Sequence, residues 1–234
     1  MSAMRICGLQ KLSMVDFPGK LAATVFTGGC NLRCPFCHNA LLVTRLSESP
    51  TLPESDVLSF LKTRRGFLDG VVLSGGEPLL QSGAMDFLRQ VRDLGYAVKL
   101  DTNGCYPAVL EKILSEGLAD YVAMDIKNSR EKYPLTCGVS SMDMGAIDAS
   151  ICPLRGSGVD YEFRTTVVRE LHEEADFTAI GQWLHGAKAY YLQQFQDSGN
   201  LIKTGFHSPS TKQMEAFLEA AKPYFNVVKL RGVN

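Results

Sequence analysis

Residues 21–39, LAATVFTGGCNLRCPFCHN, set an apolar run directly before a loop that carries three cysteines. Leu21–Thr27 is rich in β-branched and aromatic residues, which predicts a buried strand. Cys30, Cys34 and Cys37 follow in a CxxxCxxC arrangement. Three thiols on a loop directly after a strand indicate a place where chemistry is carried out.

Similar strand candidates recur along the chain, separated by amphipathic helical patterns. This alternation is typical of βα units that build a parallel sheet. Six or seven such units in 234 residues favour a full or partial barrel, although an open doubly wound sheet gives a similar pattern. The expected strands are Leu21–Thr27, Gly70–Ser74, Tyr96–Asp101, Ala119–Ile126, Asp160–Val168, Lys188–Gln194 and Phe225–Leu230.

We therefore predict an α/β fold, a partial (βα)6-type barrel with parallel strands. No repeat or boundary divides the chain, so we expect a single domain over residues 1–234, with a core at about 20–195 and a C-terminal helix and strand at 208–230. Residues 138–156 are expected to be helical and residues 39–53 irregular. The expected signals at helix N-termini are a Thr51–Glu54 capping box, Ser82, Pro107, Asp176 and Ser210.

Composition narrows the class of protein. Apolar residues make up 45% and charged residues 21%, which is typical of a globular domain, and the net charge of -1 gives no support to a nucleic-acid partner. No apolar run approaches the roughly 20 residues of a membrane span, and Met1 to Leu12 lacks a signal-peptide pattern. We therefore expect a cytoplasmic protein with no membrane contact.

Seven cysteines in a reducing compartment indicate metal or redox chemistry rather than disulfides. Thiolate-rich sites select zinc or iron–sulfur. Structural zinc needs a fourth ligand, which His38 or a distant cysteine could supply; three cysteines on a cluster instead leave one iron open to an external ligand. The other four cysteines lack ligand spacing and are expected to be buried as small apolar residues: Cys7, Cys105, Cys137 and Cys152.

Polar residues also follow the next three expected strands. Considered alone, a Gly-Gly-Glu stretch is a tight βα loop, an Asp-Thr-Asn-Gly stretch is an Asx-type turn, and an Asp-Ile-Lys stretch is a solvated charge pair. Parallel strands bring their carboxyl ends to one edge of a sheet. The residues concerned are Gly75, Gly76, Glu77, Asp101, Asn103, Asp125 and Lys127.

The three cysteines, with Phe36 just before the third, resemble the cluster loop of the radical S-adenosylmethionine (radical SAM) superfamily. The resemblance implies that Cys30, Cys34 and Cys37 hold a [4Fe-4S] cluster whose fourth iron is chelated by S-adenosylmethionine. Reduction then gives methionine and a 5'-deoxyadenosyl radical, so the cofactors carry the chemistry and no catalytic side chain is expected. The resemblance covers roughly Leu12 to Phe195 and implies one radical SAM domain.

The later motifs resemble those of the glycyl-radical activating enzymes within this superfamily. The resemblance implies that Gly75, Gly76 and Glu77 bind the methionyl amine and that Lys127 meets the cosubstrate carboxylate. Phe36 and Asn103 are further cofactor contacts that we expect. Asp101 and Asp125 would lie near the carboxylate, around a bound monovalent cation, and Arg164 is a candidate for the same pocket. Where some activating enzymes have a histidine after the sixth strand, this chain has Gln193–Gln196.

The segment Asp16–Lys20 resembles the activating proteins of anaerobic ribonucleotide reductase. The expected function is therefore an activase that generates a glycyl radical on a partner, anaerobic ribonucleoside-triphosphate reductase. Because the chain has no Rossmann or flavin fingerprint, we expect flavodoxin or ferredoxin to deliver the electron. Two alternatives stay open: a radical SAM enzyme for a small heterocycle, similar to 7-carboxy-7-deazaguanine synthase, and a zinc-stabilised interaction module.

Overall fold

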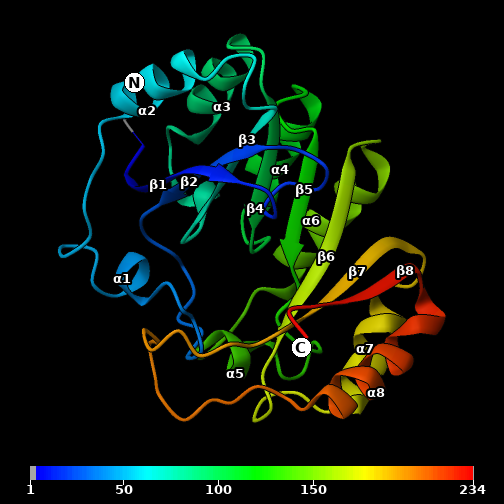
Figure 1. The fold of residues 1–234 in the computed structure, drawn as a ribbon. Coiled ribbons are helices and arrows are strands. Elements are labelled where there is room, and N and C mark those ends of the chain that lie inside the picture. The colour runs from blue at the N-terminus through cyan, green and yellow to red at the C-terminus, as the bar shows by residue number, and fades with distance from the viewer. Residues whose placement is uncertain (1–3, 234) are drawn as a thin grey trace. The chain divides into compact units, whose positions relative to one another are not determined.

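The computed structural model describes residues 4–233, which alternate between strands and helices (Figure 1). The strands follow the sheet in chain order, from β1 to β8. The described residues form two compact units. Unit 1 comprises the chain up to Asn31, Leu41–Ala123 and Ala146–Asp160, and unit 2 comprises Leu32–Ala40, Met124–Gly145 and the chain from Tyr161.

Unit 1 is built on a parallel core of three strands. Most central residues of β2, β3 and β4 are buried apolar side chains, with the polar Thr24 and Lys99 buried among them, and β3 pairs in parallel with both of its neighbours. The β5 strand begins in this unit. The strands are β1 (Ile6–Ser13), β2 (Ala22–Thr27), β3 (Gly70–Gly75), β4 (Ala97–Thr102) and β5 (Tyr121–Asp125).

The helices of unit 1 bury one apolar face each. In α3, for example, Phe87, Leu88 and Val91 are fully buried, at the spacing of one helix face. The elements are α1 (Ala40–Val43), at the boundary of the units, α2 (Glu54–Thr63), η1 (Pro78–Leu80), α3 (Ala84–Asp93), α4 (Pro107–Ser115) and most of α6 (Met144–Gly156).

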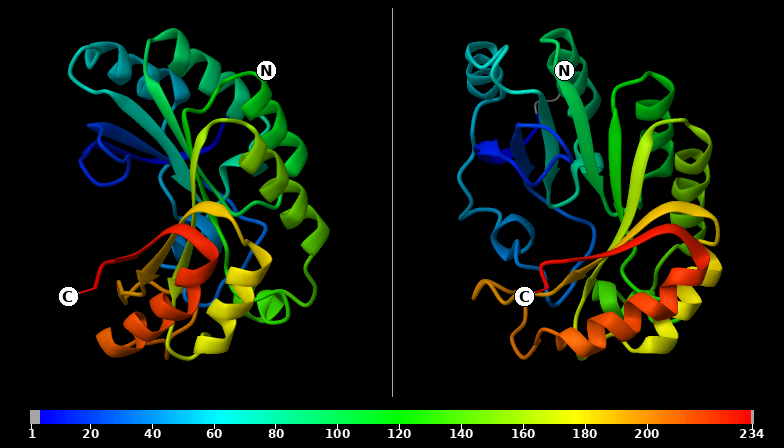
Figure 2. Two further views of the ribbon diagram at one scale, coloured as in Figure 1. Left: turned by 90° about the vertical axis from the view of Figure 1, so that its right-hand side faces the viewer. Right: turned by 45° about the vertical axis from the view of Figure 1, so that its right-hand side comes forward.

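Unit 2 contains a second set of parallel strands, with β7 paired to β6 and to β8. Helices α7 and α8 lie side by side (Figure 2), and the rings of Phe177 and Phe217 stack between them at 4.7 Å. The elements are α5 (Tyr133–Cys137), β6 (Asp160–Val167), α7 (Glu174–Trp183), β7 (Ala187–Gln194), α8 (Thr211–Ala221), η2 (Lys222–Tyr224) and β8 (Phe225–Arg231).

The seven predicted strands are present as β2 to β8, but β1 was not predicted. It forms an antiparallel hairpin with β2, and register shifts between Ile6 and Gly8 and between Gln10 and Ser13 break its alternation. A strand with two irregularities lacks the period-two burial pattern by which strands are recognised.

The predicted helix ends were right in part. Pro107 opens α4, and Ser210 caps α8 by accepting from Gln213 N–H. The Thr51 capping box was wrong, because α2 begins after Pro53, which has no side-chain oxygen to offer. Ser82 was wrong by one residue, since Gly83 is the N-cap of α3. Asp176 was expected at the start of α7, but Glu173 is the N-cap, and Asp176 lies at the third helical position, where it completes a capping box with Glu173.

Candidate functional site

The cysteine loop begins at the end of β2, where unit 1 holds it through backbone contacts. Gly29 has φ +94, and its N–H donates to Leu42 O at 2.7 Å. A Cβ on Gly76 would lie 2.0 Å from Gly29 O, so only glycine permits this approach. Glu77 N–H donates to the same carbonyl at 2.8 Å. The Gly-Gly-Glu turn is therefore docked on the loop residue just before Cys30.

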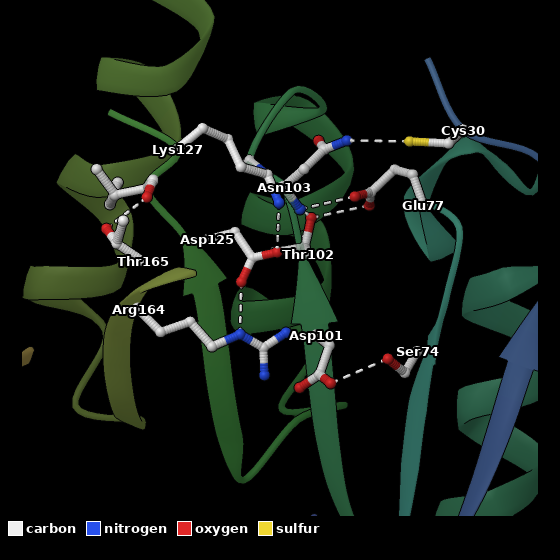
Figure 3. A network of polar contacts seen from close by, with 12 residues as sticks. Cys30, Ser74, Glu77, Asp101, Thr102, Asn103, Asp125, Lys127, Arg164 and Thr165 are labelled. Carbon is white, nitrogen blue, oxygen red and sulfur yellow. Dashed lines mark hydrogen bonds and ion pairs between the residues drawn. The ribbon is translucent and has the colours of Figure 1, made fainter. Parts of the chain in front are cut away.

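Glu77 is fully buried, and its carboxylate accepts three hydrogen bonds within unit 1, of which Figure 3 shows those from Thr102 and Asn103. Oε1 accepts from Leu79 N–H at 3.0 Å and from Thr102 Oγ1 at 2.8 Å, and Oε2 accepts from Asn103 N–H at 2.7 Å. The side chain thus joins the turn after β3 to the end of β4. These bonds compensate for burying a carboxylate.

Asp101 lies near the end of β4, where its carboxylate is already paired. It contacts the buried Lys99 ammonium and accepts from Ser74 Oγ at 2.9 Å. A bound cation near Asp101 stays a prediction, and the contact with Lys99 already neutralises the carboxylate's charge.

In unit 2, Asp125 at the end of β5 lies between two cations (Figure 3). Its Oδ2 accepts from Lys127 Nζ at 2.7 Å and its Oδ1 from Arg164 Nε at 2.5 Å. Burial alone would raise the pKa of the Asp125 carboxyl, but the charges of Arg164 and Lys127 hold that pKa well below its usual range. Burial would likewise lower the pKa of Lys127, and the Asp125 charge instead raises it well above its usual value.

Unit 2 holds the remainder of the cysteine loop. Arg33 N–H donates to Cys137 O at 2.9 Å, and Lys203 N–H donates to Pro35 O at 2.8 Å. The Phe36 ring makes edge contacts with Phe195 and Phe206, with centroids 6.3 and 6.5 Å apart. The loop therefore rests on the C-terminus of α5 and on the segment after β7.

Unit 2 holds three cysteines, and in two of them, Cys34 and Cys37, the thiol pKa is shifted in opposite directions. A hydrogen bond from the Cys137 side chain outweighs the effect of burial and, with the Lys127 charge, lowers the pKa of the Cys34 thiol to about 7. Burial raises the pKa of the Cys37 thiol. Cys34 is therefore the more readily ionised of the two and the better ligand for a metal centre.

Sequence reasoning assigned no role to His172, yet the structure places it against Lys127. Its Nδ1 lies 3.1 Å from Val168 N and 3.2 Å from Val168 O, and its Nε2 lies 2.9 Å from Lys127 O. A ring that accepts the Val168 N–H at Nδ1 carries its proton on Nε2 and donates it to Lys127 O. His172 thus fixes the backbone that carries Lys127. An isolated histidine carries no spacing signal, so only the fold could reveal this contact.

Other predicted residues have structural roles. Gln194 Nε2 donates to Pro209 O at 2.7 Å and Gln196 Nε2 to Gly232 O at 3.4 Å, so both side chains hold backbone. Cys7 and Cys137 are buried as expected. Cys152 is exposed, against expectation, because it lies on the outer face of α6, and Cys105 is half-buried.

Two features are absent from residues 4–233. None of the helices there is long and apolar enough to cross a bilayer. Nor do three His, Cys, Asp or Glu side chains in that range already lie close enough together to bind one ion. Cys30 belongs to unit 1, whereas Cys34 and Cys37 belong to unit 2. Their joint role as ligands therefore stays a prediction.

Comparison with known proteins identifies the family. Residues 24–177 match the radical SAM superfamily. The chain therefore belongs to the radical SAM superfamily and is a radical SAM enzyme, an oxidoreductase. Membership implies a [4Fe-4S] cluster and S-adenosylmethionine as cofactors.

Among its relatives, the chain is 32% identical over 236 residues to a protein of Methanocaldococcus jannaschii provisionally named a glycyl-radical enzyme activating enzyme, covering 98% of this chain and 96% of that one. Partial matches are the pyruvate formate-lyase-activating enzyme of Clostridium pasteurianum, 33% identical over 53% of this chain and 52% of that one, and the 7-carboxy-7-deazaguanine synthase of Halobacterium salinarum, 39% identical over 37% and 34%.

Solved structures show the fold. Streptococcus suis SuiB bound to S-adenosylmethionine superposes with a TM-score of 0.62 at 14% identity, covering 87% of this chain and 48% of SuiB. The chain thus spans about half the length of that structure. The likeness confirms the predicted α/β class with a parallel, barrel-type sheet.

The residues present fit the implied cofactors by the chemistry of their side chains. Cys30, Cys34 and Cys37 lie on one loop and form no disulfide, as ligands of a cluster with one open iron must. Asp125, Lys127 and Arg164 together carry a formal charge of about +1, which suits an anionic carboxylate.

Proposed function

We propose that this enzyme is an activase, which generates a glycyl radical on a partner enzyme. The observation that carries the proposal is the match over 98% of this chain to a relative provisionally named for that activity. The match to a 7-carboxy-7-deazaguanine synthase covers only 37% of the chain. A relationship that spans nearly the whole length takes in all the loops in which the candidate residues lie.

In this proposal Cys30, Cys34 and Cys37 hold the cluster. When bound, the reduced cluster supplies the electron that splits S-adenosylmethionine into methionine and a 5'-deoxyadenosyl radical, which takes a Cα hydrogen from a glycine of the partner. The proposed cofactor contacts are Phe36, Gly75, Gly76, Glu77, Asp101, Asn103, Asp125, Lys127 and Arg164.

The residues of unit 2 bind and orient the cosubstrate carboxylate. Asp125 accepts from both Lys127 and Arg164, and these three side chains together carry a formal charge of about +1, which suits an anionic ligand. These side chains are 17–26% exposed, which leaves them accessible. His172 fixes the Lys127 backbone, so the ammonium is presented from a rigid position.

The residues of unit 1 act mainly through their backbone. The Glu77 carboxylate accepts hydrogen bonds from three protein donors, and these bonds fix the turn that carries Gly75 and Gly76. Backbone carbonyls of that turn are then the groups that accept hydrogen bonds from the methionyl amine. Glu77 would position the cosubstrate through this turn.

The partner follows from the segment Asp16–Lys20, whose resemblance supports anaerobic ribonucleoside-triphosphate reductase. Flavodoxin or ferredoxin would deliver the electron. The test mixes the anaerobically reconstituted, reduced protein with S-adenosylmethionine and that reductase, and records electron paramagnetic resonance while assaying 5'-deoxyadenosine. We expect a glycyl-radical doublet that is absent with Cys34→Ala. Deoxyadenosine without a doublet would reject this partner.

A second candidate is a radical SAM enzyme for a small heterocycle, which the partial match to a 7-carboxy-7-deazaguanine synthase favours. It predicts many turnovers of a small substrate with no protein partner present. A third reading, a zinc-stabilised module, predicts a colourless protein after anaerobic purification, whereas a cluster gives a brown one.

A further inference from the structure

The Asn103 side chain lies beside Cys30 in unit 1, and each of its polar groups has a partner. Asn103 is only 5% exposed. The Asn103 backbone N–H donates to Glu77 Oε2 at 2.7 Å, and the side-chain Oδ1 accepts from the Cys105 backbone N–H at 2.9 Å. The second bond fixes which end of the amide is oxygen and which is nitrogen. The NH2 group must therefore point toward the cysteine loop.

An amide nitrogen carries two hydrogens, and two acceptors lie in front of this one. Nδ2 donates to Asn31 Oδ1 at 2.8 Å, and it lies 3.8 Å from Cys30 Sγ, within hydrogen-bonding distance for sulfur. Figure 3 shows the contact from Asn103 to Cys30. Because Glu77 holds the Asn103 backbone, the donor is aimed at the sulfur by a buried scaffold.

We infer that Asn103 is a positioning residue that hydrogen-bonds the Cys30 sulfur and thereby raises the reduction potential of the cluster. The inference rests on the proposed function, in which Cys30 is a cluster ligand. Reduction adds negative charge to the cluster and its thiolates. An N–H dipole directed at one of those sulfurs stabilises the reduced form more than the oxidised form.

The test is a redox titration of the anaerobically reconstituted full chain, followed by electron paramagnetic resonance of the reduced cluster. Asn103→Leu has nearly the same shape without a donor. We expect the equilibrium constant for one-electron reduction to fall by about fivefold to tenfold, where tenfold corresponds to 59 mV. Asn31→Ala is the matched control, because it removes the hydrogen bond from Asn103 Nδ2 to Asn31 and leaves the donor to Cys30. The reduction potential of the cluster in this variant should stay at the wild-type value.

The outcomes separate this inference from the proposed function. If the wild-type chain takes up no four-iron cluster, or if Cys30→Ala keeps an unchanged one, the proposed function fails and the inference fails with it. If the cluster assembles in both variants and Asn103→Leu keeps the wild-type potential, only the inference is overturned. Equal shifts in Asn103→Leu and Asn31→Ala would show a role in holding the loop and would also overturn it.

A second measurement does not need Asn103→Leu. Selective labelling of asparagine replaces ¹⁴N by ¹⁵N at Asn103 Nδ2 and at the other asparagine nitrogens, and electron spin echo modulation of the reduced wild-type cluster detects a ¹⁵N nucleus hydrogen-bonded to a ligand sulfur. We expect ¹⁵N modulation that persists in Asn31→Ala. Its absence from the wild-type spectrum would overturn the inference, even if Asn103→Leu failed to assemble a cluster.

Discussion

Asp125 is the side chain on which the charge balance of unit 2 depends. Asp125→Asn would leave Lys127 and Arg164 facing each other without a carboxylate between them. We expect the free energy of unfolding at pH 7 to fall by about 2 kcal/mol, below the usual loss for a fully buried pair because these side chains are 17–26% exposed. Urea denaturation measures this.

The control for that variant is Asp86→Asn. Asp86 pairs with Arg89, and both side chains are 43–46% exposed. Solvent screens such a pair, so its loss should cost less than about 0.5 kcal/mol. Equal losses in the two variants would contradict the importance assigned to Asp125.

His172 makes stability depend on pH. Burial lowers the pKa of His172 below its ordinary 6.5, so the folded chain keeps the ring neutral. Well above pH 6.5 the His172 ring is neutral in both the folded and the unfolded chain. As the pH falls below 6.5, the ring is protonated first in the unfolded chain, and this stabilises the unfolded chain relative to the folded one. The free energy of unfolding should therefore decrease at up to about 1.4 kcal/mol per pH unit.

Burial also lowers the pKa of His38, so a variant must isolate His172. His172→Gln keeps an N–H donor for Lys127 O but cannot titrate. Urea denaturation between pH 5 and 7 should show a shallower dependence of the free energy of unfolding on pH for this variant than for wild type. Identical slopes for wild type and His172→Gln would refute the prediction.

At the scale of single residues, sequence motifs indicate which side chains belong to the site but not which groups they contact. Glu77 and Asn103 stand out because each follows a strand. Nothing in the sequence shows that the Glu77 carboxylate accepts a hydrogen bond from the Asn103 backbone N–H. His172 meets Lys127 from 45 residues away along the chain, and such a separation leaves no local pattern.

Among the elements, the end of α5 bears most directly on the cysteine loop. Gly138 follows this helix with φ +66, and a Cβ there would lie 2.1 Å from Arg33 O. Gly138→Ala should therefore destabilise the protein by more than about 2 kcal/mol, since it adds a backbone clash to the cost of the left-handed conformation. Thermal unfolding with circular dichroism measures the loss.

Gly117→Ala provides the matched control. Gly117 has φ +64 but open space around its Cβ position, so only the conformational cost of about 1 kcal/mol applies. If the two variants lost the same free energy of unfolding, the close approach of Gly138 to Arg33 O would add nothing to the cost of Gly138→Ala.

Element boundaries show where local signals suffice. Ser210 and Gln213 lie next to the helix that they cap, so their pattern predicts it correctly. Thr51 and Glu54 have the same spacing, but Pro53 between them is the N-cap. Two residues with the right spacing are insufficient when a proline closer to the helix fixes the backbone.

For the molecule as a whole, an ion pair with one buried partner helps to hold the last strand. Glu162 on β6 is 1% exposed and accepts from both terminal nitrogens of Arg231 on β8. Arg231→Met would leave that carboxylate buried without its partner, at a cost of about 3 kcal/mol. Hydrogen exchange should show protection lost in β7 and β8 and retained in β3 and β4.

Lys222→Met is the control, since its partner Glu219 and Lys222 itself are 63–64% exposed. It should leave exchange unchanged. Uniform loss of protection in Arg231→Met, including β3 and β4, would show instead that the two units unfold together.

The fold class could be predicted because βα alternation repeats over the whole chain, and each repeat supports the others. The division of the candidate residues between two units could not. The chain passes from one unit to the other between Asn31 and Leu32, inside the cysteine loop, and no change of composition marks the place. The single domain predicted from the sequence stays a prediction.

The anchors of the cysteine loop also have a consequence for biosynthesis. The loop leaves the ribosome early, but the residues that hold it in unit 2, Cys137, Lys203 and Phe206, are translated much later. Until then its thiols have no finished surroundings in the nascent chain. We expect iron and sulfide to be inserted only after synthesis is almost complete, so that assembly factors meet a nearly folded protein.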